Sequence, residues 1–129
     1  MSNLNAVITA WVRGTYAGTN DLASVVADFN SLPKTEITLT PGTSSGNADL
    51  IFMDTRTLSA SSTENLDLAG SLTDPLGATL TFATVKAIYV KAASGNTNNA
   101  VVGGAGSNTL LGIFSDATDK ILVKPGGVF

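Results

Sequence analysis

The segment from Leu80 to Gly106 constrains the fold of this chain more than any other. The run Val85–Val90 is rich in β-branched and aromatic residues, and a loop of small and amide residues, Ala93–Asn99, follows it. A second apolar run, Ala100–Val102, then leads into three glycines within four positions. This order is typical of two strands joined by an exposed loop. We therefore expect a hairpin whose loop Ala93–Asn99 is exposed and tolerates insertions.

Short runs of the same kind recur along residues 35–129, separated by turn-forming residues. Pro41-Gly42 and Asp74–Gly77 are turn sequences, since proline pre-sets φ at the second turn position and glycine fits the last. A bulge or break at Ala83-Thr84 would keep the flanking apolar side chains inside. Such short, evenly spaced strands favour an all-β domain over residues 35–129, a β-sandwich or barrel-like (jelly-roll-type) domain. The expected strands are Glu36–Thr40, Asp49–Asp54, Thr63–Leu68, Thr79–Ala92, Leu110–Phe114 and Asp119–Val123.

Residues 1–34 are expected to form a separate N-terminal arm or strand, with at most one short helix. The segment Ala6–Tyr16 alternates in a way that leaves apolar residues on both faces, which favours a strand. A helical spacing also fits part of this segment, through Leu4, Val7, Ile8, Trp11 and Val12.

The short helix would begin after Asn20 or Asp21, because either side chain can cap a helix, and Pro33 would end it. Its apolar face would follow the spacing i, i+3, i+4, i+7. The residues with that spacing are Leu22, Val25, Val26 and Phe29.

The composition is polar but weakly charged. Only 13% of the residues are charged, and Thr, Gly, Ser and Asn supply 52 of the 129 residues, so solubility depends on hydroxyl and amide groups. A weakly charged surface also packs readily against other subunits. The net charge is −3 and the seven basic residues are scattered, so we expect no nucleic-acid binding. We also expect no membrane span and no signal peptide, since no apolar run is long enough and no basic region precedes one.

Histidine and cysteine are absent, which removes the commonest nucleophile pairs and metal ligands. Two carboxylate pairs remain as calcium candidates, Asp49 with Asp54 and Asp116 with Asp119, although turn capping is the favoured interpretation for both. Glu64 and Asp67 would point to opposite faces of a strand, so they make a poor glycosidase pair. We therefore predict no catalytic, cofactor-binding or metal-binding residues and a non-enzymatic protein.

Three further patterns have weak functional interpretations. Gly103–Leu110 resembles a calcium-binding nonapeptide with Asn108 in place of the aspartate, but a single copy favours a plain loop. Lys91 and Ser94 flank an open loop, where nothing would activate a Ser–Lys pair. An aromatic set could line a carbohydrate site, but we expect most of it in the core. Its members are Trp11, Tyr16, Phe82 and Tyr89.

The sequence ends on two apolar residues, Val128 and Phe129, after Lys124-Pro-Gly-Gly. We expect either that this pair packs against a neighbouring chain or that the native chain continues beyond it.

Several segments, taken in order, resemble a family of small structural proteins from tailed bacteriophages and prophages. The similarity runs from about Ile37 to Phe129. It is carried by Asp54–Leu58, Glu64–Gly70, Leu80–Ala87, Gly95–Asn99, Val101–Gly104 and Lys124–Gly127.

The resemblance implies a virion protein, made in the cytoplasm of a bacterial host and without catalytic residues. We expect a capsid decoration or cement protein that binds the major capsid protein, copies of itself, or both, as a homo-oligomer within the virion. Two alternatives stay open. One is a tail component such as a tube, tip or fibre part. The other is a carbohydrate-binding module for host-surface glycans.

Overall fold

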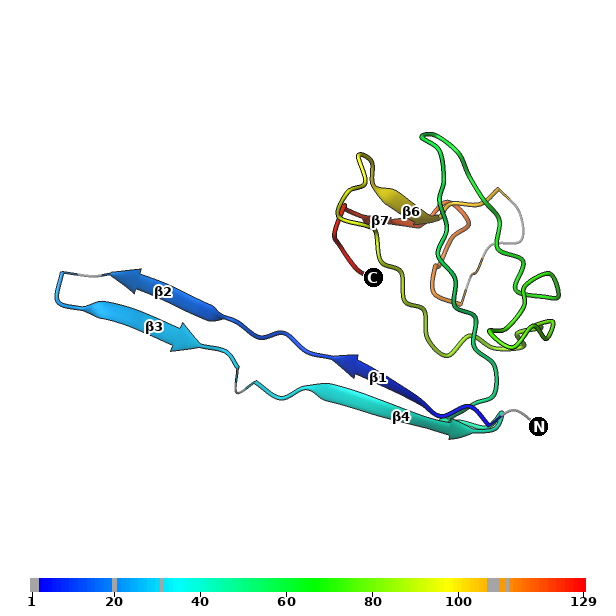
Figure 1. Cartoon of the computed structure of the whole chain (residues 1–129), viewed down its shortest axis with the longest axis horizontal. Coiled ribbons are helices and arrows are strands. Elements are labelled where there is room, and N and C mark those ends of the chain that lie inside the picture. The colour runs from blue at the N-terminus through cyan, green and yellow to red at the C-terminus, as the bar shows by residue number, and fades with distance from the viewer. Residues whose placement is uncertain (1–2, 20, 31, 107–109, 111) are drawn as a thin grey trace. The chain divides into compact units, whose positions relative to one another are not determined.

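The computed structural model of this chain is all-β and describes residues 3–19, 21–30, 32–106, 110 and 112–129. Among these residues there is no helix, and so none that could cross a membrane. The strands form three small sheets, with the orders β1-β4-β5, β2-β3 and β6-β7 (Figure 1). The strands are β1 (Ala6–Ala10), β2 (Thr15–Thr19), β3 (Ser24–Asp28), β4 (Thr35–Pro41), β5 (Asn47–Ala48), β6 (Ala100–Gly103) and β7 (Lys120–Val123).

The chain divides into two compact units, residues 1–51 and 52–129, which are described separately. The sequence placed a boundary between residues 34 and 35. In the structure β4 lies beyond that point but pairs with β1, so the two sides of the expected boundary share a sheet. Long-range pairing of this kind leaves no local mark on the sequence.

The first unit contains one long hairpin, which we call the ribbon (residues 6–41). β1 pairs with β4 and, further along the same hairpin, β2 pairs with β3, both antiparallel (Figure 1). The expected strand Glu36–Thr40 is confirmed as part of β4. Its Ile37 and Leu39 face the same side as Ile8 and Ala6 of β1, and Leu39 is buried. This side of the ladder is therefore apolar.

The expected N-terminal strand is real but interrupted. The ladder stops at Ala10 and resumes at Thr15, where the Phe29 N–H donates to the Gly14 carbonyl over 2.8 Å. The expected short helix is wrong, because Ser24–Asp28 is strand β3. Its two adjacent β-branched residues, Val25 and Val26, suit a strand better than a helix. Pairing with β2 outweighed the helical spacing.

A side chain fastens the end of the ribbon. The Asn47 amide donates to the Thr40 hydroxyl over 2.7 Å and to the Thr40 and Pro41 carbonyls. Gly42 and Gly46 of the intervening loop have positive φ of 134° and 77°. The chain thus bends back at Pro41-Gly42, as expected, and short β5 lies parallel to β4.

The second unit contains the turn expected at Asp74–Gly77. The Gly77 N–H donates to the Asp74 carbonyl, and the Asp74 carboxylate accepts from the N–H groups of Leu76 and Ala78. The flanking segments run antiparallel, since the Leu80 N–H donates to the Leu72 carbonyl over 2.8 Å. Leu72 and Leu80 are both buried, so this hairpin contributes to a core.

The loop Ala93–Asn99 is exposed, as predicted, but the hairpin assigned to it is wrong. β6, which follows the loop, pairs with β7, and Val90 before the loop exchanges two backbone hydrogen bonds with Phe129. Both flanks therefore pair with the C-terminal segment instead of with each other. The chain bends at Ala83-Thr84, where a bulge or break in a strand was expected, and Ala92 and Val123 are buried.

The described residues form neither a closed barrel nor a clear sandwich. The strands expected at Asp49–Asp54, Thr63–Leu68 and Leu110–Phe114 are wrong, since none of their described residues lies in a strand ladder and the Phe114 N–H donates to the Leu110 carbonyl in a turn. The strand expected at Thr79–Ala92 is also wrong, because only Thr79 and Lys91 pair there, each in an isolated bridge. Alternation predicts an extended backbone, but a strand also needs a neighbour to pair with. The strand expected at Asp119–Val123 did find one and is β7.

Candidate functional site

The Asp116/Asp119 pair caps its own turn. The Asp116 carboxylate accepts from the Thr118 N–H and hydroxyl, each over 2.8 Å. The Asp119 carboxylate accepts from the Asp116 N–H over 3.0 Å and from the Ser115 hydroxyl over 3.1 Å. These hydrogen bonds occupy carboxylate oxygens that a calcium ion would need. The two aspartates therefore cap a turn, which is the interpretation that the sequence favours.

The same contacts act on the acidity of Asp116. The backbone N–H of Thr118, and after it the Thr118 hydroxyl, lower the pKa of the Asp116 carboxyl below its ordinary value of 3.8. Hydrogen bonds to a carboxylate favour its charged form. Asp116 therefore keeps its charge, and its turn, further into the acid range than a free aspartate does.

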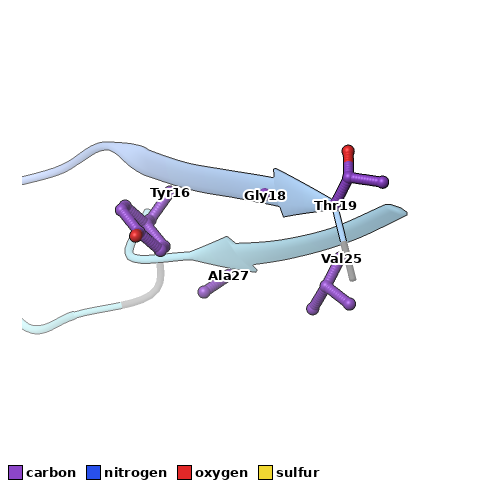
Figure 2. A pocket seen from close by; sticks show the side chains of 5 residues that line it. All are labelled: Tyr16, Gly18, Thr19, Val25 and Ala27. Atoms are coloured by element: carbon purple, nitrogen blue, oxygen red, sulfur yellow. The ribbon is translucent and has the colours of Figure 1, made fainter. Parts of the chain in front are cut away.

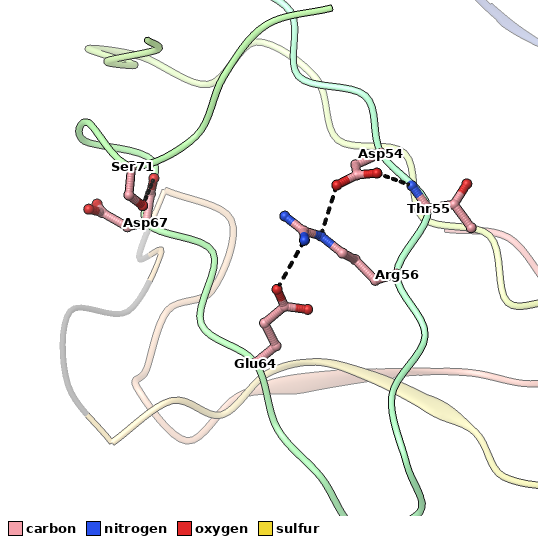
Figure 3. A network of polar contacts seen from close by, with 6 residues as sticks. All are labelled: Asp54, Thr55, Arg56, Glu64, Asp67 and Ser71. Atoms are coloured by element: carbon pink, nitrogen blue, oxygen red, sulfur yellow. Dashed lines mark hydrogen bonds and ion pairs between the residues drawn. The ribbon is translucent and has the colours of Figure 1, made fainter. Parts of the chain in front are cut away.

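The other acidic candidates belong to separate local networks. Arg56 contacts Asp54 over 3.2 Å and Glu64 over 3.4 Å, so one cation joins two segments of the second unit (Figure 3). Asp67 instead accepts from the Ala69 N–H over 2.9 Å. Asp49 lies in the first unit and Asp54 in the second. In the part of the chain that the structure describes, no three acidic residues gather as a metal site would require.

The glycine-rich segment begins with a close approach of backbones. Gly103 has φ of 95°, and a Cβ there would lie 2.6 Å from the Asp119 carbonyl oxygen. Glycine at this position is thus required for packing against the turn before β7. Asn108, which takes the aspartate position of the calcium pattern, lies outside the described residues.

Lys91 and Ser94 lie in different local settings. Lys91 pairs with Val128 in an isolated antiparallel bridge. Ser94 lies in the loop, where its Cβ is 3.7 Å from the position a Gly126 Cβ would take. No hydrogen bond joins the two side chains in the described part of the chain.

The expectation that most of the aromatic set lies in the core is wrong. Tyr16 and Tyr89 are each 72% exposed and Trp11 is 47% exposed, with Arg13 stacked 5.0 Å from the Trp11 ring centre. Phe82 alone is half-buried. Tyr16 lies on the two-stranded β2–β3 ladder and Trp11 lies in the gap between β1 and β2, and at neither place do the described residues bury the ring.

Sequence reasoning missed a shallow hollow on the β2–β3 ladder (Figure 2). Tyr16 and Gly18 of β2 lie opposite Ala27 and Val25 of β3, and Thr19 completes the rim. Gly18 makes the hollow, since a Cβ built there meets no atom within 4 Å. The available signal is the segment Thr15–Thr19, but the helical spacing of its partner, Ser24–Asp28, hides the pairing.

The C-terminal pair is engaged within the chain. Phe129 and Val90 exchange backbone hydrogen bonds of 2.8 and 2.9 Å, and the Gly127 N–H donates to the Lys124 carbonyl over 2.7 Å. With Pro125 second and Gly126 third at φ of 77°, residues 124–127 form a type II turn. Val128 stays 62% exposed.

Comparison of this chain with models of protein families, with curated proteins and with solved structures gave no match. The functional argument therefore depends on the exposed surfaces just described. Those surfaces are apolar, weakly charged and strand-built, which suits binding to other macromolecules.

Proposed function

We propose that this chain is a non-enzymatic structural protein of a tailed-bacteriophage virion, most specifically a decoration or cement protein that stabilises the head. The observation that carries the proposal is the open apolar surface of the ribbon. Its exposed large apolar side chains are Val7, Trp11, Val12, Tyr16, Leu22, Val25, Val26, Phe29, Leu32 and Ile37.

A ribbon of this kind requires a neighbour. Two strands form a single layer, and an isolated two-stranded hairpin is at best marginally stable in water. Contiguous apolar patches on soluble proteins commonly mark interaction sites. A shell of fixed subunits supplies a permanent covering surface, and many weak contacts repeated over it become collectively strong.

Two sequence features support the same assignment. The ribbon carries few charges, so no strong repulsion opposes its burial against the major capsid protein or against copies of this chain. The resemblance to phage structural proteins lies mainly in the second unit, from Asp54–Leu58 to Lys124–Gly127. We also propose that the β6–β7 sheet, through the side that carries the buried Val123, is one layer of a sandwich-type domain.

The deciding experiment is to locate the chain by electron microscopy in purified particles of the phage that encodes it. Density for the chain on the outer face of the head supports the decoration role. Density on the tail would keep the structural class and exclude decoration. Absence of the chain from particles would overturn the whole proposal.

A retention measurement tests the ribbon directly. Replacing Val7 and Val26 with Thr should release the chain from particles at a lower chaotrope concentration, because both side chains would lose apolar burial. The matched control is Leu76→Thr, which changes a residue that is 84% exposed on a turn of the second unit. Equal retention of both variants would show that the ribbon is not buried on the particle.

The glycan-binding alternative is favoured by one observation, the exposure of Tyr89 and Tyr16. Exposed aromatic rings can stack on sugar rings through their apolar faces. Saturable binding of the purified chain to host polysaccharide, lost in Tyr89→Ala, would support it. Under the structural proposal, Tyr89→Ala should leave retention on particles unchanged.

A further inference from the structure

We propose that the free edge of β2 is a self-association site that takes β2 of a second copy of this chain. The two strands would pair antiparallel about a two-fold axis at Ala17, joining two ribbons into a four-stranded sheet. This inference goes beyond the proposed function and would hold whether or not the chain belongs to a virion.

The first support is that this edge is open and unprotected. Among the described residues, only β3 pairs with β2. Natural proteins blunt such edges with lysine, proline or bulges. β2 reads Thr-Tyr-Ala-Gly-Thr and carries none of these, nor any charge. A second copy would thus meet no like-charge repulsion along the pairing.

The hydrogen-bond pattern between β2 and β3 determines which backbone N–H and C=O groups of β2 are free to pair with a second copy. The bond from the Phe29 N–H to the Gly14 carbonyl makes Gly14 and Phe29 a hydrogen-bonded pair. In an antiparallel ladder such pairs alternate with non-bonded ones. Tyr16 and Gly18 therefore direct their N–H and C=O groups toward β3, while Thr15, Ala17 and Thr19 direct theirs outward.

A two-fold axis at Ala17 uses all of these outward groups. Ala17 would form a hydrogen-bonded pair with its own copy, and Thr15 with Thr19 of the second copy. Threonine pairs across strands are favourable. This registration is self-complementary, as the surface of an isologous dimer must be.

The hollow at Gly18 supplies the specificity. In the same registration Tyr16 of one copy lies opposite Gly18 of the other, in a non-hydrogen-bonded pair where side chains approach most closely. The exposed Tyr16 ring would cover the bare backbone at Gly18 and contact Val25 beside it, the arrangement known to stabilise glycine in strands. One copy thus provides both the ring and the hollow that receives it.

The edge of β3 fits a second copy less well. A similar two-fold axis at Val26 would place Asp28 opposite Ser24, and β3 contains no glycine against which a large side chain could pack. Five residues of strand pairing also bury less than the roughly 1,600 Å² of a standard interface. We therefore expect weak association that depends on concentration.

Cross-linking of the purified full-length chain tests the registration, because the chain has no cysteine of its own. Ala17→Cys should form a covalent dimer under mild oxidation at high concentration. Hydrogen-bonded pairs have Cα atoms about 5.5 Å apart, and disulfides span about 4.4–6.8 Å. The matched control is Val26→Cys, because Val26 is exposed and lies directly opposite Ala17 on β3. In the proposed pairing, the two Val26 residues of a dimer lie far apart.

Adding Tyr16→Ala to Ala17→Cys should lower dimer yield at least about five-fold, since the ring that covers Gly18 of the other copy is lost. Tyr16 is 72% exposed in the isolated chain, so this change should leave the ribbon folded. Sedimentation of the cysteine-free chain, with and without Tyr16→Ala, gives the same comparison without cross-linking. Equal cross-linking at positions 17 and 26, insensitivity to Tyr16→Ala, or a wild-type chain that stays monomeric at millimolar concentration would overturn the proposal.

Discussion

The two units of this chain contain the same share of apolar residues but bury them differently. Counting Ala, Val, Ile, Leu, Met, Phe, Trp and Tyr, residues 1–51 contain 22 and residues 52–129 contain 34, or 43% and 44%. Among described residues, the first unit buries Leu39, whereas the second buries Leu72, Leu80, Ala92 and Val123. Composition therefore does not decide burial here. Tertiary packing does, since side chains of the same apolar types are exposed on the ribbon and buried in the second unit.

The largest expected effect lies in the core of the second unit. Leu80 is 1% exposed, so Leu80→Ala should lower the free energy of unfolding by about 2–5 kcal/mol, through lost burial and the cavity left behind. Urea denaturation of the full-length chain measures it. Leu76→Ala, at an exposed position, should change stability by less than about 0.5 kcal/mol. Equal effects of the two variants would mean that the second unit has no core at Leu80.

The next effect tests the close approach at Gly103. Gly103→Ala places a Cβ 2.6 Å from a backbone oxygen and forces φ of 95° on a residue with a side chain. We expect a loss of about 1–3 kcal/mol, again from urea denaturation. The control Gly95→Ala has open space and no positive φ. If Gly103→Ala were as stable as that control, β6 could not pack against the turn before β7 as described.

A small effect is expected on the ribbon. Val26 is 63% exposed, so Val26→Thr should change the free energy of unfolding by less than about 0.5 kcal/mol, although it removes an apolar side chain. A loss near that of Leu80→Ala in dilute, monomeric protein would show that the ribbon folds against something within its own chain. That outcome would erase the contrast between the two units.

The smallest effect concerns acid. Because the Thr118 N–H and hydroxyl lower the pKa of Asp116, the stability that this carboxylate adds is present above its ordinary pKa of 3.8 and is lost as pH falls through the lowered value. Thr118→Val removes the hydroxyl bond and should raise the pKa of Asp116 toward 3.8, while the backbone bond remains. An NMR titration of the Asp116 carboxyl measures it. Thr97→Val, in the exposed loop, should leave that pKa unchanged.

Local signals predicted the turns of this chain better than its strands. The alternation in Glu36–Thr40, the proline and glycine of Asp74–Gly77, and the small polar residues of Ala93–Asn99 each specify a backbone conformation from within a few residues. Turn capping by Asp116 and Asp119 could be anticipated for the same reason, since aspartate bonds to N–H groups two or three residues away.

Local signals could not predict which strands, far apart in the sequence, pair with each other. Ser24–Asp28 has helical spacing and β-branched residues together, and only pairing with β2 decided between them. The flanks of the Ala93–Asn99 loop look like a hairpin, yet both pair with the C-terminal segment. The hollow at Gly18 exists only because β3 supplies Val25 and Ala27 beside it.

The sequence by itself determined an all-β chain with weak charge, no histidine, no cysteine and its principal turns. Only the tertiary structure decided which strands are neighbours, and so which apolar residues are covered. The physical reason is that φ and ψ preferences act within a few residues, whereas burial depends on a second surface from elsewhere in the chain. Tyr16 and Leu80 illustrate this, because both carry large apolar side chains, yet Tyr16 is 72% exposed and Leu80 is 1% exposed.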